Sequence, residues 1–346
     1  MSYIDDVKKT ANIDLPWNKF DGKNILITGA TGLIGSCLVD VLMHLTNQNF
    51  HIYAMGRNCT RAKRLFRAYN HLDNFHFIQH DITMPLKTDV DFHYIIAAAS
   101  GANPVAYSTD PVGTMKSNFV GADNLFQYGI NHGLEKYVYV SSGDVYGEGD
   151  GRIFTEDYSG YVNPLHLRSC YSSVKRATET LCISYASQYG IDVSIARPCH
   201  TFGPHFTESD SRVYAQFIRD AVRNDKIVMK STGEQFRSWC YVVDCASAIL
   251  HILLKGDSGE AYNIADDNGN ITIRHLAELI ADAENKEVVI ELPSDIEKRG
   301  YNVVSKSVFS TSKIKTLGWN LSGSLRHKII TTIEEYKRRL QDTPEQ

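Results

Sequence analysis

Short apolar segments alternate with longer helical ones through the first two thirds of the chain. The apolar segments are rich in β-branched and aromatic residues, as expected of strands that are covered on both faces. They are Asn24–Thr28, Phe50–Met55, Phe75–Ile78, Phe92–Ala97, Tyr137–Ser141 and Val193–Arg197. The helical segments between them include Leu33–Leu45, Val112–Asn131 and Ser172–Gln188. Such alternation predicts an α/β fold built on a doubly wound parallel sheet.

The pattern changes after Arg197-Pro198, where shorter elements are separated by clusters of Gly, Pro, Asn and Asp such as Asp266–Asn270. We therefore expect a sheet domain over residues 21–198 and a smaller, mainly C-terminal lobe over residues 199–341 that closes over the sheet edge. Residues 1–20 form an N-terminal extension before the first strand. The last predicted helix, Arg326–Leu340, carries a charged run that we interpret as a solvated face.

Composition narrows the classes of partner. The chain has 36 basic and 40 acidic side chains and a formal net charge of -4. This charge balance does not favour binding to a nucleic acid or an anionic membrane. Its seven cysteines include no C-x-x-C pair and suit a reducing compartment. No stretch reaches the roughly 18 apolar residues of a spanning helix, and the N-terminus does not resemble a signal peptide. We expect a cytoplasmic protein without a membrane partner.

A glycine-rich loop joins the first strand to the first long helix. It reads Thr28-Gly29-Ala30-Thr31-Gly32-Leu33-Ile34-Gly35. Gly29 permits a tight turn, Gly32 lets the backbone approach a phosphate, and Gly35 lets the helix pack on the strand. The helix N-terminus adds free N–H groups and a partial positive charge. In this strand-loop-helix context the motif predicts a Rossmann domain that binds NAD or NADP.

The second strand leaves the choice of coenzyme open. Dinucleotide folds usually place an acidic residue there for the adenosine ribose, but this strand ends Ala54-Met55-Gly56-Arg57-Asn58. Arg57 would stack on adenine or pair with a 2′-phosphate. After the third strand, Asp81-Ile82 offers an adenine contact, although capping of a turn explains Asp81 nearly as well. We expect NAD, with NADP as the alternative.

Tyr171 and Lys175 lie four residues apart and therefore share one face of a helix. A nearby ammonium favours the phenolate, so this pairing predicts a lowered tyrosine pKa and a general base that works near neutral pH. Ser141-Ser142 ends the fifth strand, where a hydroxyl can bond the substrate oxygen being oxidised. A Y-x-x-x-K pair alone is also an ordinary helix face, but the glycine loop and the strand-end serine make the combination specific.

At this point the sequence resembles the extended short-chain dehydrogenases/reductases, which include the nucleotide-sugar epimerases, dehydratases and decarboxylases. Within that family it looks most like the UDP-glucuronate decarboxylases (UDP-xylose synthases). The segments that carry this likeness are Ser100–Tyr107, Asp110-Pro111, Thr114–Asn118, Arg168–Tyr171, Lys175–Leu181, Thr201–Pro204, Ser211–Val213, Phe236–Ser238 and Tyr241–Asp244. The resemblance implies that a nucleotide-diphosphate sugar, with UDP favoured, binds in the lobe over residues 199–341. It also implies a homodimer through a four-helix bundle of Val112–Asn131 and Ser172–Gln188.

The resemblance implies these site residues. The catalytic set is Tyr171, Lys175, Ser142 and Asp144. The set expected at the cofactor is Gly29, Thr31, Gly32, Leu33, Ile34, Gly35, Arg57, Asp81, Ile82, Ala97, Ala98, Ala99, Asn118, Ser141, Tyr171, Lys175 and Arg197. The set expected at the substrate is Tyr107, Ser142, His200, Arg212, Arg237 and Arg299. The thirteen histidines show no metal-ligand spacing, so we expect no metal.

Two positions depart from the family pattern. Asp144 stands where decarboxylases and 4,6-dehydratases have a glutamate, which keeps the acid one methylene shorter, although a loop aspartate could simply cap a turn. His200 replaces a common asparagine near the diphosphate, and donation to phosphate, a different substrate and a structural histidine are all open. For Arg212 and Arg237 we favour diphosphate or uridine contacts over surface ion pairs, because a guanidinium binds phosphate bidentately.

The function implied is modification of a nucleotide sugar through a transient 4-keto sugar, which in a uronic acid leads to loss of carbon dioxide. Such an enzyme would serve polysaccharide biosynthesis. A 4,6-dehydratase or a 4-epimerase is the alternative within the same chemistry. A catalytically silent dinucleotide-binding sensor or scaffold is the alternative from another class, and the intact Ser142, Tyr171 and Lys175 argue against it.

Overall fold

The computed structural model describes residues 2–102, 104–291 and 306–341. Its centre is a seven-stranded parallel sheet in the order β10-β6-β5-β4-β1-β2-β3. The strands in chain order are β1 (Asn24–Thr28), β2 (His51–Gly56), β3 (Phe75–Gln79), β4 (Tyr94–Ala97), β5 (Lys136–Val140), β6 (Asp192–Pro198) and β10 (Ala261–Ile264). The predicted α/β fold with a doubly wound parallel sheet is confirmed, and the six predicted strands end within two residues of the observed ones.

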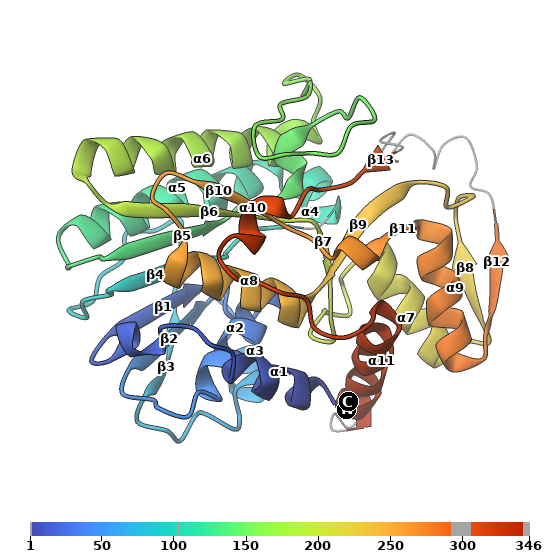
Figure 1. The fold of residues 1–346 in the computed structure, drawn as a ribbon, viewed down its shortest axis with the longest axis horizontal. Helices are drawn as coiled ribbons and strands as arrows, with labels where there is room; N and C mark the ends of the chain where they lie inside the picture. The colour runs from blue at the N-terminus through green and yellow to red at the C-terminus, as the bar shows by residue number, and fades with distance from the viewer. Residues whose placement is uncertain (1, 103, 292–305, 342–346) are drawn as a thin grey trace.

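Helices cover both faces of this sheet (Figure 1). One face carries α5 (Pro111–Ile130) and α6 (Ser169–Tyr189), and the other carries α2 (Leu33–Met43) and α8 (Val242–Lys255). Successive strand residues face opposite sides, so Leu26 belongs to the core under α5 and α6 while Ile25 and Ile27 belong to the core under α2 and α8. Burial on both faces explains the nearly continuous apolar runs of these strands.

The chain returns to the sheet after residue 198. Strand β10 pairs in parallel with β6, and α8 packs beneath β5 and β6. The predicted boundary at 198 is therefore not where the chain finally leaves the sheet. Sequence patterning missed β10 because it is only four residues long and follows a loop rich in Gly and Asp.

The remaining elements gather at one end of the sheet, to the right in Figure 1. They are β7 (His200–Phe202), α7 (Val213–Arg223), β8 (Lys226–Met229), β9 (Phe236–Tyr241), β11 (Asn270–Thr272), α9 (Ile273–Glu284), β12 (Glu287–Ile290), β13 (Lys306–Ser307) and α11 (Leu325–Gln341). Strand β9 pairs with β7, β11 and β13, while β8 pairs with β12. A short helix α10 (Ser312–Lys315) leads from β13 towards α11. Among the residues described, no helix is both long enough and apolar enough to cross a membrane.

A buried ion-pair cluster ties α11 to the sheet domain. The ammonium of Lys328 lies 2.7 Å from Asp244 of α8 and 2.5 Å from Asp266, which follows β10. All three side chains are at most 2% exposed. The C-terminal helix is thus held to the sheet domain through buried charge as well as through its apolar face.

The N-terminal extension packs on the helix that follows the glycine loop. Helix α1 (Tyr3–Ala11) contacts α2 and α8, and it lies beside α11 in Figure 1. Tyr3 donates a hydrogen bond of 2.7 Å to Asp40 of α2, and Tyr69 donates one of 3.0 Å to the same carboxylate. Residues 3–11 therefore complete a buried polar cluster on α2, a role that the sequence had not suggested.

This cluster predicts a pH dependence of stability. Burial raises the pKa of Asp40 to about 7, against the lowering effect of the two tyrosine hydroxyls. Because the folded protein then binds a proton more tightly than the unfolded chain, the free energy of unfolding should fall as pH rises from about 4 through 7, by up to about 1.4 kcal/mol per pH unit. Urea unfolding at a series of pH values tests this, and Asp40→Asn should flatten the slope over that window. An unchanged slope in the variant would contradict the assignment.

Candidate functional site

The loop between β1 and α2 has the close backbone approach that a dinucleotide requires. Gly29 has a φ of 63°, and a Cβ there would lie 2.7 Å from the carbonyl oxygen of Ala98. A Cβ on Gly35 would overlap the Gly29 carbonyl group. Gly32 is the N-cap of α2, and no side chain caps this helix. The first N–H groups of α2 therefore face the loop without a side-chain partner, as a pyrophosphate site needs.

Two expected cofactor residues lie at the ends of β2 and β3 with different surroundings. Arg57 is exposed directly after Gly56. Asp81 accepts hydrogen bonds of 3.0 Å and 2.8 Å from the backbone and hydroxyl of Thr83, which lower its pKa. Asp81 thus has the turn-capping role that was the alternative to an adenine contact. Ile82 is half-buried and its carbonyl oxygen accepts a bond from α5.

The residues after β4 are fixed by their neighbours. Ala97 ends the strand, and the N–H of Ala99 donates to the hydroxyl of Thr28 at 3.2 Å. Asn118 of α5 donates to Ser100 at 3.1 Å and accepts from Tyr139 at 3.2 Å. Its buried amide therefore holds the loop after β4 in place.

Tyr171 and Lys175 lie together on α6, as the spacing predicted. The ammonium of Lys175 lies 5.6 Å from the centre of the Tyr171 ring and 4.6 Å from that of Tyr139. It donates to the carbonyl oxygen of Val140 at 2.8 Å. On its other side the Tyr171 ring stacks on Tyr107 of α4 (Pro104–Thr109), with centroids 4.7 Å apart. The phenol is thus held between a fixed cation and a second aromatic ring.

The sequence predicted a lowered pKa for Tyr171, but the groups of the protein by themselves raise this pKa. Burial and the nearby Asp144 carboxylate raise its pKa to about 12, although Ser142 and Arg212 act in the opposite direction. Burial also lowers the pKa of Lys175 to about 7, because a cation is costly in this environment. The spacing of the two residues along the helix could not show this, because burial is the largest cause of both shifts.

The two serines at the end of β5 have different partners. Ser141 donates to Glu179 at 2.6 Å. Ser142 caps a 3₁₀ turn (Gly143–Tyr146) by accepting from the N–H of Asp144 at 3.1 Å. It also forms a hydrogen bond with Tyr171 that lowers the tyrosine pKa. Of the two serines, Ser142 is therefore the one with a hydrogen bond to Tyr171.

Three arginines converge on this group of side chains. Arg168, which precedes α6, places its guanidinium 5.9 Å from the ring centre of Tyr107. Arg212 is bound to Asp210 by two hydrogen bonds of 2.9 Å and 2.5 Å, while its charge still lowers the Tyr171 pKa. Arg212 therefore forms the ion pair that was the alternative to a nucleotide contact, although its charge also acts on Tyr171.

The third arginine, Arg237, is held by His200. It donates to His200 Nε2 at 2.8 Å, and burial followed by the Arg237 charge lowers the histidine pKa to about 3. His200 is thus a neutral ring, which excludes it as a cationic phosphate ligand. Arg237 Nε is buried without a hydrogen-bond partner among the described residues, whereas His200 also has a hydrogen bond with the backbone of Ser238. Because buried polar atoms are normally paired, Arg237 Nε is able to donate to a ligand.

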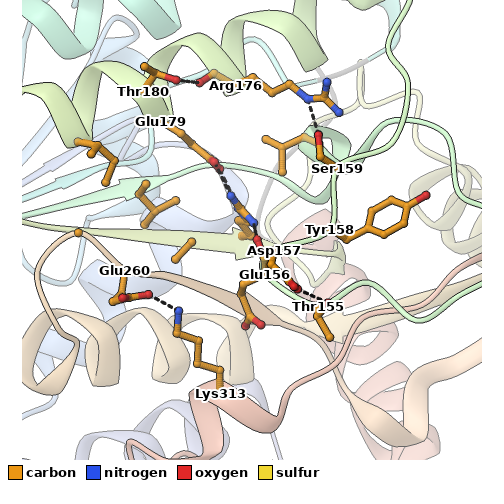
Figure 2. Close-up of a pocket in the computed structure, with 16 residues that line it drawn as sticks. Thr155, Glu156, Asp157, Tyr158, Ser159, Arg176, Glu179, Thr180, Glu260 and Lys313 are labelled. Carbon is orange, nitrogen blue, oxygen red and sulfur yellow. Dashed lines mark hydrogen bonds and ion pairs between the residues drawn. The ribbon is translucent and has the colours of Figure 1, made fainter.

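A separate pocket lies beside α6 (Figure 2). It encloses about 720 Å³ between α6, β6 and the segment around Glu156, and none of the predicted catalytic residues lines it. Arg197 lies here: it donates to Glu179 at 3.0 Å and 2.7 Å and to Tyr146 at 3.1 Å. Its guanidinium is therefore bound by protein groups.

The chain is similar in sequence to a known family of proteins. The family model described as "NAD dependent epimerase/dehydratase family" matches residues 25–265, which span the sheet, the glycine loop and the Tyr-Lys helix. The chain belongs to this epimerase/dehydratase family. UDP-glucuronic acid decarboxylase 6 of Arabidopsis thaliana is 34% identical over 320 residues, covering 91% of this chain and 89% of that protein. UDP-glucuronic acid decarboxylase 1 of Danio rerio is 30% identical over 325 residues, covering 93% and 74%.

Solved structures show the same fold. UDP-glucuronic acid 4-epimerase of Bacillus cereus, in complex with UDP-glucuronic acid and NAD, has a TM-score of 0.79 and 22% identity, covering 91% of this chain and 99% of that one. The expected family resemblance is confirmed, and with it the assignment as a nicotinamide-dependent enzyme of nucleotide sugars. Among the described residues, no group of three or more His, Cys, Asp or Glu could hold a metal ion.

The glycine loop and the Tyr-Lys helix of this chain fit a nicotinamide dinucleotide. Side chains at Gly29 and Gly35 would clash with backbone atoms, so these glycines let the loop close tightly at the N-terminus of α2, which no side chain caps. Lys175 has a buried ammonium beside Tyr171 that can bond a ribose hydroxyl. The family's dependence on NAD therefore agrees with the loop and the catalytic helix of this structure.

Sequence reasoning missed several functional neighbours. Glu179 lies four residues after Lys175, so the helical period could have placed it on the same face. Arg168 belongs to the family-like segment Arg168–Tyr171, but the sequence did not indicate a role for its side chain. Arg61, which donates to the Thr31 carbonyl oxygen at 2.9 Å, gave no local signal. The expected substrate residue Arg299 lies outside the described residues.

Proposed function

We propose that this enzyme decarboxylates a UDP-linked uronic acid, with UDP-glucuronic acid as the substrate. The observation that carries the proposal is a group of three arginines near the Tyr-Lys pair: Arg168 and Arg212 lie near Tyr107 and Tyr171, and Arg237 lies beside His200, on whose pKa all three arginines act. A nucleotide sugar brings a diphosphate and a uronic acid adds a carboxylate, so several guanidiniums are needed to bind this anion. Relatives named UDP-glucuronic acid decarboxylase at 30–34% identity support the same substrate.

The side chains of the site suit a reaction that begins at the C4 hydroxyl of the sugar. Tyr171 takes the hydroxyl proton, and Ser142 orients the oxygen by a hydrogen bond. NAD, when bound, supplies the acceptor and later the donor of the C4 hydride, and its cationic ring favours a nearby phenolate. The resulting 4-keto group stabilises carbanion character at C5, so a carboxylate there leaves as carbon dioxide. Asp144, beside Tyr171, assists reprotonation at C5 directly or through water.

The mass of the product tests the proposal against its two rivals. With UDP-glucuronic acid as substrate we expect a product lighter by one carbon dioxide. A 4,6-dehydratase would instead give loss of water on its own substrate, and a 4-epimerase would give a product of unchanged mass. Mass spectrometry of the reaction, with the Tyr171→Phe protein as the blank, distinguishes these outcomes. An unchanged mass with both NAD and NADP present would refute decarboxylation.

We also infer a homodimer that forms through α5 and α6. Exposed apolar side chains gather on these helices, namely Val112, Met115, Phe119 and Val120 of α5 with Ile183 and Tyr189 of α6. An apolar surface of this kind on a water-soluble fold favours a protein partner. Sedimentation velocity should show a dimer that Phe119→Asp dissociates, whereas Ile330→Asp on α11 should not. A monomeric wild-type protein would refute the inference.

The cellular setting follows from the same proposal. All seven cysteines are unpaired thiols, which supports a reducing compartment, and we place the enzyme in the cytoplasm. Its product, a nucleotide-activated sugar, would feed the synthesis of polysaccharides.

A further inference from the structure

The adenosine end of the coenzyme site differs from what an NAD enzyme requires. In Rossmann domains a carboxylate at the end of the second strand bonds the ribose hydroxyls of NAD. Here β2 ends at Gly56 and continues as Arg57-Asn58, so the strand end carries no acid. The Asn58 side chain accepts from the N–H of Arg61 at 2.8 Å and caps the next helix, α3 (Cys59–Leu65). Asp81 at the neighbouring strand end is bound to its own turn.

The missing acid is not forced by lack of space. A Cβ at Gly56 would lie 3.4 Å from the Thr31 hydroxyl and 3.7 Å from the Phe77 ring, which are ordinary van der Waals distances. The φ of Gly56 is not in the left-handed region. A side chain at this position would therefore be accepted, and it would face Thr31 of the glycine loop.

Positive charge takes the place of the acid. Arg57 is exposed, and its guanidinium has no hydrogen bond or ion pair with any residue in the described ranges. Behind it, Arg61 is bound through carbonyl oxygens, at 2.9 Å to Thr31 and 3.0 Å to His205. Burial, Arg339 and Arg64 lower the Arg61 pKa to about 10, because a cation is costly when buried beside like charges. Arg57 and Arg61 thus place two guanidiniums near the glycine loop, while the nearby carboxylate of Asp81, whose pKa Arg57 lowers, is already bonded to Thr83.

We propose that the coenzyme site binds the 2′-phosphate of NADP through Arg57, so that this chain binds NADP at least as tightly as NAD. A guanidinium bonds a phosphate through two parallel N–H groups, and the absence of an acid at position 56 removes the repulsion that excludes a 2′-phosphate. Arg61 positions the glycine loop through Thr31 and adds to the field. The inference concerns the coenzyme alone and stands whichever nucleotide sugar is the substrate.

Binding of the two dinucleotides tests the proposal without turnover. Titration calorimetry on the full chain, freed of bound dinucleotide, should give an NADP⁺ Kd no larger than that of NAD⁺. Arg57→Ala should weaken NADP⁺ about 10- to 100-fold and NAD⁺ by less than about threefold, because a charge-assisted hydrogen bond to phosphate is lost. Arg64→Ala, an exposed arginine of α3, is the matched control for loss of one positive charge and should change both affinities little.

Gly56→Asp provides the reciprocal variant. It should lower the affinity for NADP⁺ by about 100-fold or more through repulsion and leave or improve that for NAD⁺. Adenosine 2′,5′-bisphosphate and 5′-AMP, used as competitors, should separate the same way. Wild-type protein that binds NAD⁺ much more tightly than NADP⁺, or an Arg57→Ala variant that loses both equally, would overturn the proposal. Neither result bears on the product mass, so failure here is distinct from failure of the proposed decarboxylation.

Discussion

Tyr171→Phe should lower kcat by about 10²- to 10⁴-fold while the protein still folds and binds its coenzyme, because a general base contributes a factor of this size. The change removes one oxygen from a buried ring that keeps its stacking on Tyr107. The phenol loses its hydrogen bond with Ser142, but the ring keeps its packing, so the fold should be retained. Steady-state turnover and dinucleotide titration on the same preparation measure the two properties.

A matched tyrosine controls for the loss of a buried hydroxyl. Tyr128, on the distal part of α5, donates to the carbonyl oxygen of Val90 at 2.6 Å. Tyr128→Phe should cost some stability and leave kcat unchanged. Turnover of Tyr171→Phe at the wild-type rate would remove the tyrosine from the mechanism, and equal losses in both variants would indicate a stability effect.

Lys328→Met should destabilise the protein by about 3–5 kcal/mol, because it leaves two buried carboxylates without their cation. The lysine lies 2.7 Å from Asp244 and 2.5 Å from Asp266, and each of the three side chains is nearly inaccessible. Urea denaturation, analysed for both midpoint and slope, measures the loss. A change below about 1 kcal/mol would mean that the carboxylates are neutral or hydrated in solution.

Two further variants isolate the buried charge. Lys313→Met removes a lysine whose partner, Glu260 at 2.5 Å, is half exposed, and should cost about 1 kcal/mol or less. Adding Asp244→Asn and Asp266→Asn to Lys328→Met should recover part of the stability, because the uncompensated charges disappear. No recovery would show that packing of the lysine stem, rather than charge, holds α11.

The sequence was sufficient for the core of the fold because its strands are buried on both faces. β1 and β6 can be recognised in the sequence as apolar runs. In contrast, β10, β7 and β13 are two to four residues long and pair with strands far along the chain. A pattern of local hydrophobicity does not contain such pairings. The second lobe was therefore expected as a region, while its strand pairing was not predicted.

The site residues also fall into those that local sequence could predict and those that it could not. Tyr171 and Lys175 could be predicted because residues four apart share one face of a helix. Gly29 could be predicted because its loop follows a strand directly. Arg197 was assigned to the cofactor, yet its side chain lies on the α6 side of β6 with Glu179, since neighbouring strand residues face opposite ways. The raised Tyr171 pKa and the His200–Arg237 hydrogen bond depend on burial and tertiary contact, which spacing cannot report.

The late return of the chain to the sheet has a consequence for synthesis on the ribosome. β6 ends at residue 198, but its neighbour β10 begins only at residue 261, and α8 between them covers the apolar face below. Until that stretch has emerged, the nascent chain exposes an open strand edge beside uncovered apolar side chains, which is a template for aggregation. A fragment cut at residue 198 keeps this edge open permanently. The nucleotide-binding half is therefore not a separable folding unit, and expression of this enzyme in pieces should require residues through at least 264.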